Sequence, residues 1–297
     1  MPEPVNGPIV VNAPAKVNLA LRVGHRREDG DHGVDTVMLT LGLSDVLTAD
    51  FHEDGARLVR RPDPGFPESE DLCMRAAVAL ADAFGREPAV LLHLDKEIPV
   101  AAGLGGGSAD AAAVLVACCS LWGVDPGSPR VEEVAASLGA DVPFMLRGGC
   151  AWLSGRGDVL VAELDVPELD VVLVNPGVGV ATADVYAAFD WLCSPTKADL
   201  DAVVHALATG DRTRIAASLT NDLTEAAFEV APRIAEAFAF VRDQPGTLGT
   251  LVAGSGGTVF GITESASSAT DTALAAAERG WWSEATIAAQ PRPGVGG

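Results

Sequence analysis

Cysteine and long apolar runs are scarce in this chain of 297 residues, and each shortage excludes a class of protein. The five cysteines are odd in number and form no C-x-x-C pair, which argues against a disulfide framework or a zinc site and favours a reducing cytoplasm. The most apolar stretch, Ala111 to Trp122, is shorter than the ~18 residues of a membrane span. The N-terminus has no basic start followed by an apolar run. We therefore expect a cytoplasmic protein with no secretion signal and no membrane span.

Basic residues are also few. The chain has 20 Lys+Arg against 41 Asp+Glu, a formal net charge of −21 at pH 7. This charge repels a phosphate backbone or an anionic membrane surface, so we expect no nucleic-acid partner. Only three lysines are present: Lys16, Lys96 and Lys197. An anionic ligand must therefore be held by a local device, such as a glycine-rich loop or a single lysine.

Hydrophobic residues make up 48% of the chain, enough to bury a sizeable core over a length typical of two domains or one large one. Hydrophobic spacing predicts strands over 10–23, 36–43, 45–51, 89–94, 151–153 and 171–174. It predicts helices over 72–84, 110–122, 131–138, 183–192, 200–207 and 231–241. The segment 158–169 is acidic and contains proline, so we place a domain boundary there, between 1–160 and 161–297. Residues 291–297 are expected to form a loose tail. The pattern favours an α+β fold.

A glycine loop provides the first functional signal. Residues 99–109 read PVAAGLGGGSA and lead directly into the predicted helix 110–122. Glycines let backbone N–H groups approach a ligand, and the helix N-terminus brings a positive dipole end to the same place, so the loop predicts a phosphate cradle. A ligand-free strand-to-helix turn is the alternative. The loop is not a Walker A motif, because Gly107 stands where that motif has lysine, and Ser108 stands where a dinucleotide fingerprint has its third glycine.

Lys16 and Asp141 are candidate catalytic residues. Phosphoryl transfer to an alcohol requires a carboxylate that accepts the hydroxyl proton and a cation that stabilises the developing charge. Lys16 lies near the start of a predicted strand, and Asp141 lies in a predicted loop where Pro143 interrupts the helical pattern. An exposed strand-edge charge and a local cap are the alternatives. His32, Tyr186 and the cluster 254–257 have similar ordinary interpretations as a turn histidine, a core or rim residue and a hairpin turn.

Four segments taken together resemble the GHMP small-molecule kinases: PAKVNLAL at 14–21, PVAAGLGGGSADAA at 99–112, LGADVPF at 138–144 and AGSGGTVF at 253–260. Within that superfamily, the PAKxN start, the DGxH turn at 29–32, LGADVP and the N-D-L at 221–223 are most similar to the 4-diphosphocytidyl-2-C-methyl-D-erythritol kinase family of non-mevalonate isoprenoid synthesis. The resemblance implies a two-domain α+β GHMP kinase fold, with a ribosomal-protein-S5-like N-terminal domain and a ferredoxin-like C-terminal domain. It also implies ATP-dependent phosphorylation of the substrate's 2-hydroxyl, with ATP and Mg2+ as cofactors, in a monomer or homodimer.

The resemblance further assigns roles by motif. Asp141 would be the general base, and Lys16 would assist the substrate hydroxyl and balance charge. Ser108 is a candidate contact for the magnesium ion, whose ligands are otherwise unassigned. The ATP-binding residues would be Pro99, Val100, Ala101, Ala102, Gly103, Leu104, Gly105, Gly106, Gly107, Ser108 and Ala109. The substrate-binding residues would be Asn18, Asp31, His32, Tyr186, Gly254, Ser255 and Gly256.

One position departs from the family pattern. The family has D-G-Y-H with a tyrosine that stacks on cytosine, whereas this chain has Asp31 in place of that tyrosine. Base–aromatic stacking contributes ~1–3 kcal/mol per base, so the change corresponds to roughly tenfold to a hundredfold in affinity. Asp31 could still accept a hydrogen bond from the cytosine amine. A paralogous kinase for a different small alcohol, a non-catalytic nucleotide-binding homologue and a Rossmann oxidoreductase are the alternative functions.

Overall fold

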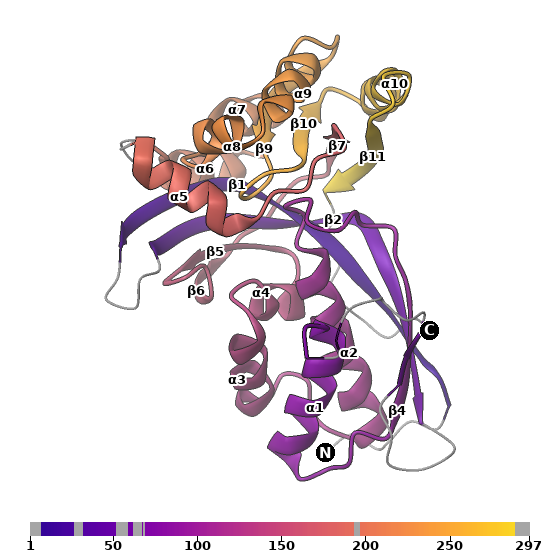
Figure 1. Cartoon of the computed structure of the whole chain (residues 1–297). Helices are drawn as coiled ribbons and strands as arrows, with labels where there is room; N and C mark the ends of the chain where they lie inside the picture. Colours follow the sequence, from indigo (N-terminus) through magenta and orange to yellow (C-terminus); the bar gives the residue numbers. More distant parts are fainter. Residues whose placement is uncertain are drawn as a thin grey trace.

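The structure is a computed structural model that describes residues 7–26, 32–51, 59–61, 67, 69–192 and 197–288. The predictions for Asp31 and for the tail 291–297 lie outside the described residues. Figure 1 shows a long two-stranded hairpin that passes between two groups of helices, one formed by the N-terminal half of the chain and one by the C-terminal half. This arrangement confirms the α+β class.

The hairpin consists of β1 (Ile9–Arg26) and β2 (His32–Phe51), which pair antiparallel along their length. Two separate strands were predicted over 36–43 and 45–51, but the structure joins them in β2. The buried carboxylate of Asp45 causes no break, because its oxygens accept hydrogen bonds from a neighbouring segment. β2 also pairs with β4 (Val90–Asp95), with β5 (Cys150–Ser154) and, through one residue, with β11 (Trp282–Ala288).

The described strands form one branched sheet with the order β3-β4-β2-β11-β7-β10-β9. β1 and β5 pair with β2 outside this path, β6 with β5, and β8 with β1. Within the C-terminal half, β7 and β9 flank β10, and all three are antiparallel. The remaining strands are β3 (Val59–Arg61), β6 (Val159–Glu163), β7 (Leu169–Asn175), β8 (Thr220–Asn221), β9 (Thr247–Val252) and β10 (Val259–Thr263).

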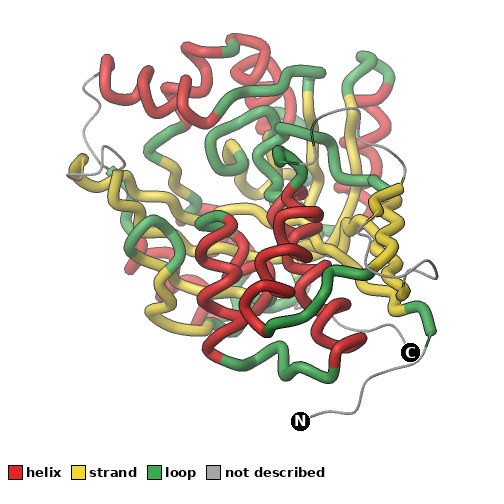
Figure 2. The backbone as a smooth tube through the Cα atoms, turned by 60° about the horizontal axis from the view of Figure 1, so that its bottom comes forward, coloured by secondary structure: helices red, strands yellow, loops and turns green. Residues whose placement is uncertain are grey.

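Four helices pack together in the N-terminal half, and Figure 2 shows them gathered in front of the strands. They are α1 (Leu72–Phe84), α2 (Gly106–Trp122), α3 (Pro129–Leu138) and α4 (Val142–Arg147). α2 is buried on every side, in agreement with its continuous apolar sequence. Asp141 lies in a turn after α3, as the predicted loop requires. The loop was expected to continue past Pro143, and this is wrong: α4 begins at Val142, because Pro143 lies in the first turn, where its missing N–H has no intrahelical partner to lose.

The C-terminal half carries the other described helices. They are α5 (Thr182–Leu192), α6 (Leu200–Thr209), α7 (Arg212–Ser218), α8 (Thr224–Val230), α9 (Pro232–Arg242) and α10 (Ala266–Ala277). None of the helices in the described ranges is long and apolar enough to cross a membrane. Residues of both halves share one core cluster, in which Val17 and Leu19 of β1 pack with Leu173 and Phe260. The division at residue 160 therefore stays a prediction.

Candidate active site

Lys16 and Asn18 lie two residues apart on β1, so both side chains project from the same face of the strand. Lys16 Nζ donates a hydrogen bond to Asn18 Oδ1 at 2.9 Å, and both residues are buried. Asn18 Nδ2 donates in turn to Thr36 Oγ1 on β2. Because the ammonium group is held from within the sheet, it is oriented before any ligand arrives.

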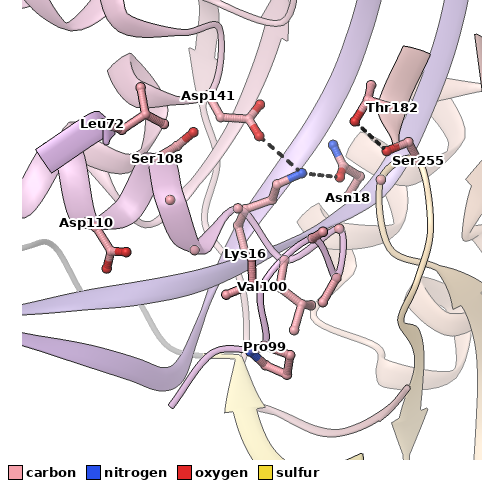
Figure 3. A pocket seen from close by; sticks show the side chains of 18 of the residues that line it. Lys16, Asn18, Leu72, Pro99, Val100, Ser108, Asp110, Asp141, Thr182 and Ser255 are labelled. Carbon is pink, nitrogen blue, oxygen red and sulfur yellow. Dashed lines mark hydrogen bonds and ion pairs between the residues drawn. The ribbon is translucent and has the colours of Figure 1, made fainter. Parts of the chain in front are cut away.

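Asp141 reaches the same ammonium group from another part of the fold. Its Oδ2 lies 3.5 Å from Lys16 Nζ, and its side chain is 31% exposed (Figure 3). Asp141 immediately precedes α4 but accepts no capping hydrogen bond, so its carboxylate is available to the space beside Lys16. The fold therefore brings together the two candidate catalytic residues of the sequence analysis: the carboxylate expected to accept a proton and the lysine expected to stabilise negative charge.

The glycine loop passes directly over Lys16. The backbone N–H of Lys16 donates to the carbonyl of Leu104, and a Cβ on Gly105 would lie 2.9 Å from Lys16 Cγ. Gly103 has a φ of 81°, and a Cβ there would lie 2.3 Å from the carbonyl oxygen of Ala253. These positions require glycine, because the loop is pressed between β1 and the turn that joins β9 to β10. α2 starts directly after the loop, at Gly106.

The C-terminal half closes the other side of the site. A Cβ on Gly254 would lie 3.3 Å from Lys16 Nζ and 3.4 Å from Asn18 Oδ1. Asn221 Nδ2 donates to the carbonyl oxygens of Val252 and Gly254, which fixes this turn. The hydroxyls of Thr182 and Ser255 lie 3.0 Å apart and link α5 to the turn (Figure 3).

These elements enclose a cavity of about 760 Å³. Most of the predicted site residues line it: Lys16, Asn18, Asp141, Tyr186, Gly254, Ser255 and every residue from Pro99 to Ser108. Three do not. Ala109 is buried in the N-terminal core, a Cβ on Gly256 would face Ile234 and Ala227, and His32 lies behind Tyr186, with the two rings stacked.

A buried charge cluster borders the cavity and was not predicted. Lys96 Nζ donates to Asp110 Oδ2 at 2.8 Å and also to Asp45, whose second oxygen accepts from the backbone N–H groups of Glu97 and Ile98. Burial is the main reason that the pKa of Asp110 rises to about 7, although the charge of Lys96 opposes the rise. Burial lowers the pKa of Lys96, but its two carboxylate partners outweigh this effect and leave it above the ordinary value.

Other lining residues were also absent from the prediction. Arg156, on the turn between β5 and β6, brings a third cation to the cavity and pairs with Asp158 at 2.8 Å. Leu72 and Leu94 form an apolar part of the wall, near Pro99. The scarcity of lysine could have drawn attention to Lys96 beside the glycine loop, whereas nothing in the local sequence distinguishes Arg156 or the two leucines.

Comparison with known proteins decides the family. The model for the GHMP kinase N-terminal domain matches residues 71–149, and the model for the GHMP kinase C-terminal domain matches residues 203–280. The 4-diphosphocytidyl-2-C-methyl-D-erythritol kinase of Streptomyces coelicolor is 42% identical over 89% of this chain and 91% of its own length. That of Pelotomaculum thermopropionicum is 44% identical over 88% of this chain and 91% of its own. The chain belongs to this family of GHMP kinases.

Solved structures agree with this assignment. A crystal structure of 4-(cytidine 5'-diphospho)-2C-methyl-D-erythritol kinase matches the GHMP kinase described here with a TM-score of 0.79 and 35% identity, over 94% of this chain and 99% of the other. A mevalonate kinase from L. major, crystallised with R-mevalonate, matches with a TM-score of 0.74 at 15% identity over all of both chains, which shows a shared fold. The chain is therefore an ATP-dependent kinase of a small molecule.

Proposed function

We propose that this GHMP kinase transfers the γ-phosphoryl group of ATP to the 2-hydroxyl of 4-diphosphocytidyl-2-C-methyl-D-erythritol. The observation that carries the proposal is the Lys16–Asp141 pair, which lies under the glycine loop in a single cavity. Relatives that bear this activity in their names are 42% and 44% identical to the chain over nearly its whole length.

The proposed chemistry follows from the positions of the charges. Asp141 accepts the proton of the attacking hydroxyl as the new O–P bond forms and the bond between the γ-phosphorus and the bridging oxygen of ADP breaks. Lys16, held by Asn18, places a positive charge where negative charge develops.

The nucleotide would lie along the glycine loop, with its phosphates at the N-terminus of α2. Leu72 and Leu94 offer an apolar surface to the base. No group of three His, Cys, Asp or Glu side chains in the described ranges could hold a metal by itself. Mg2+ shared with ATP phosphates requires only one or two protein oxygens, and Ser108 and Asp141 both line the cavity, so the lining fits this ion. Bound Mg2+ would neutralise phosphate charge.

The cytidine diphosphate end of the substrate would lie toward α5, where Tyr186 offers an aromatic face and Arg156 a cation for the diphosphate. Gly254 and Ser255 would close the acceptor end. We also propose that the protein works in the cytoplasm as a monomer or homodimer. The four cysteines in the described part of the chain are buried thiols, as a reducing compartment favours.

The test is turnover by the purified protein with Mg-ATP and 4-diphosphocytidyl-2-C-methyl-D-erythritol, followed by ADP release and phosphorus NMR of the product. We expect Asp141→Asn to lower kcat by about 10²- to 10⁴-fold, because the base is lost. ATP binding, measured by calorimetry, should change little. Asp201→Asn, an exposed carboxylate on α6, serves as the control and should leave kcat unchanged.

Absence of wild-type product would contradict the proposal, and turnover that appears only in Asp31→Tyr would indicate a kinase for a different small alcohol. ATP binding without any phosphorylated product would instead indicate a non-catalytic homologue.

A further inference from the structure

One face of α5 makes three contacts around the substrate end of the cavity. Thr182, Tyr186 and Asp190 are spaced four residues apart, so they lie on the same side of the helix. Thr182 contacts Ser255, Tyr186 lines the cavity, and Asp190 contacts His32. The wall that carries Tyr186 is therefore fastened one turn before and one turn after it. Figure 1 shows α5 beside the end of the β1–β2 hairpin where β1 finishes and His32 begins β2.

His32 connects Asp190 to Tyr186. Its Nε2 lies 3.1 Å from Asp190 Oδ1, and its Nδ1 lies 3.1 Å from the carbonyl oxygen of Gly24. The imidazole stacks on Tyr186, with the ring centroids 5.4 Å apart and an interplanar angle of 26°, and meets Phe189 edge-on. Only 8% of the His32 side chain is exposed. The ring is thus held at both nitrogens and supports one face of Tyr186.

This packing limits where a nucleobase can lie. A base between two parallel rings needs about 7 Å, twice the ~3.4 Å rise of stacked bases, which is more than separates His32 from Tyr186. In this geometry a base reaches Tyr186 from the cavity side, while His32 supports the tyrosine from behind. Without the Asp190 carboxylate, the imidazole of His32 would keep the contact of Nδ1 with Gly24 but lose that of Nε2. The ring that stacks on Tyr186 would then be held less firmly.

We propose that Asp190 is a positioning residue for nucleobase recognition, which holds His32 against Tyr186 and thereby fixes the aromatic wall of the substrate site. This inference rests on the proposed function, because it assumes a cytidine-bearing substrate at this end of the cavity. Asp190 does not line the cavity that contains the glycine loop, Lys16 and Asp141, so its effect should fall on the substrate alone.

The experiment compares Asp190→Ala with Asp190→Asn by steady-state kinetics. We expect Asp190→Ala to raise KM for 4-diphosphocytidyl-2-C-methyl-D-erythritol about tenfold, while kcat and KM for ATP stay within about twofold. Asp190→Asn should restore most of the affinity, because its amide can still hydrogen-bond the imidazole. Inhibition by cytidine monophosphate, which carries the base without the acceptor hydroxyl, should weaken in Asp190→Ala by the same factor as KM rises.

Asp184→Ala is the matched control, since it removes an exposed carboxylate from the same helix that does not line the cavity. A substrate KM in Asp190→Ala equal to that of wild type overturns the inference, as does an equal rise in KM for ATP. A wild-type enzyme with no turnover of this substrate overturns the proposed function instead, so the two failures are distinguishable.

Discussion

Asp110 and Lys96 carry opposite charges beside the cavity, and Asp110 is almost fully buried. Burial raises the pKa of Asp110 from 3.8 to about 7. The folded protein therefore binds a proton at this carboxyl in a pH range where the unfolded chain has released it. Because the folded state holds more protons, the contribution of Asp110 to the free energy of unfolding falls as pH rises from about 4 to 7 and then levels off.

We predict that Asp110→Asn removes this contribution. The neutral amide has no charge to desolvate, so the variant should lose less stability than the wild type as pH rises from 5 to 8. Urea unfolding at a series of pH values measures the difference, and Asp201→Asn, an exposed aspartate, should follow the wild type. Parallel stability curves for the wild type and Asp110→Asn would contradict the prediction.

At the residue scale, the sequence indicated the chemistry but not the contacts. Lys16 and Asp141 were predicted because alcohol phosphorylation needs a cation and a base, and the fold brings them to 3.5 Å. Asp190 could not be predicted, because an aspartate near the end of an amphipathic helix is ordinarily a solvated surface charge. Its importance comes from His32, which is distant in the chain and becomes a neighbour only after the hairpin packs on α5.

The element that most constrains the site is the glycine loop, and a substitution at Gly103 would test how closely this loop packs on its neighbours. Gly103 and Gly85 both have positive φ, so alanine costs about 1–2 kcal/mol of backbone strain at either position. At Gly85 the added Cβ meets no atom within 4 Å, whereas at Gly103 it meets the carbonyl oxygens of Ala253 and Gly256 at 2.3 and 2.4 Å. The difference between the variants therefore reports the contact between loop and turn.

We predict that Gly103→Ala lowers the free energy of unfolding by about 1–3 kcal/mol more than Gly85→Ala, because the added methyl group overpacks a backbone contact. It should also raise KM for ATP, since the loop must move away from the turn. Urea denaturation and steady-state kinetics of both variants provide the check. Equal stability losses in the two variants would show that the loop does not depend on this contact.

At the element scale, periodicity predicted six of the ten described helices and five of the eleven described strands, because burial of one face gives the sequence a regular hydrophobic spacing. The elements it did not predict include the short helices α4, α7 and α8 and the short strands β3 and β8. The errors have local causes. Pro143 was taken as a helix breaker, but it occupies the first turn of α4. The break predicted between strands 36–43 and 45–51 is absent. Asp45 is a polar residue within β2, but its carboxylate accepts hydrogen bonds from Lys96 and from the backbone that follows Lys96.

The whole molecule shares its core between the two halves. Residues of β1 pack with β7 and β10, β8 pairs with β1, and β11 pairs with both β7 and β2. Apolar surface on the hairpin is therefore buried only when the C-terminal half is folded. Exposure of that surface disfavours a state in which one half unfolds alone.

We predict a single cooperative unfolding transition. A variant with Trp122 and Trp152 replaced by phenylalanine reports on the C-terminal half through fluorescence, and one with Trp191, Trp281 and Trp282 replaced reports on the N-terminal half. Within each variant, the urea midpoint from fluorescence should coincide with that from far-UV circular dichroism. Separate midpoints within either variant would show that the two predicted domains, 1–160 and 161–297, unfold independently.

The sequence by itself determined the fold class and the family, because these depend on local composition, on periodic burial and on motifs of neighbouring residues. Only the tertiary structure decided which distant groups meet: Lys16 with Asp141, Asp45 with Lys96, and His32 with Asp190. Such pairs form when strands and helices far apart in the chain pack on one another, and no local pattern encodes the distance between their side chains. The candidate site depends on such pairs, so its geometry comes from the packing of the whole chain.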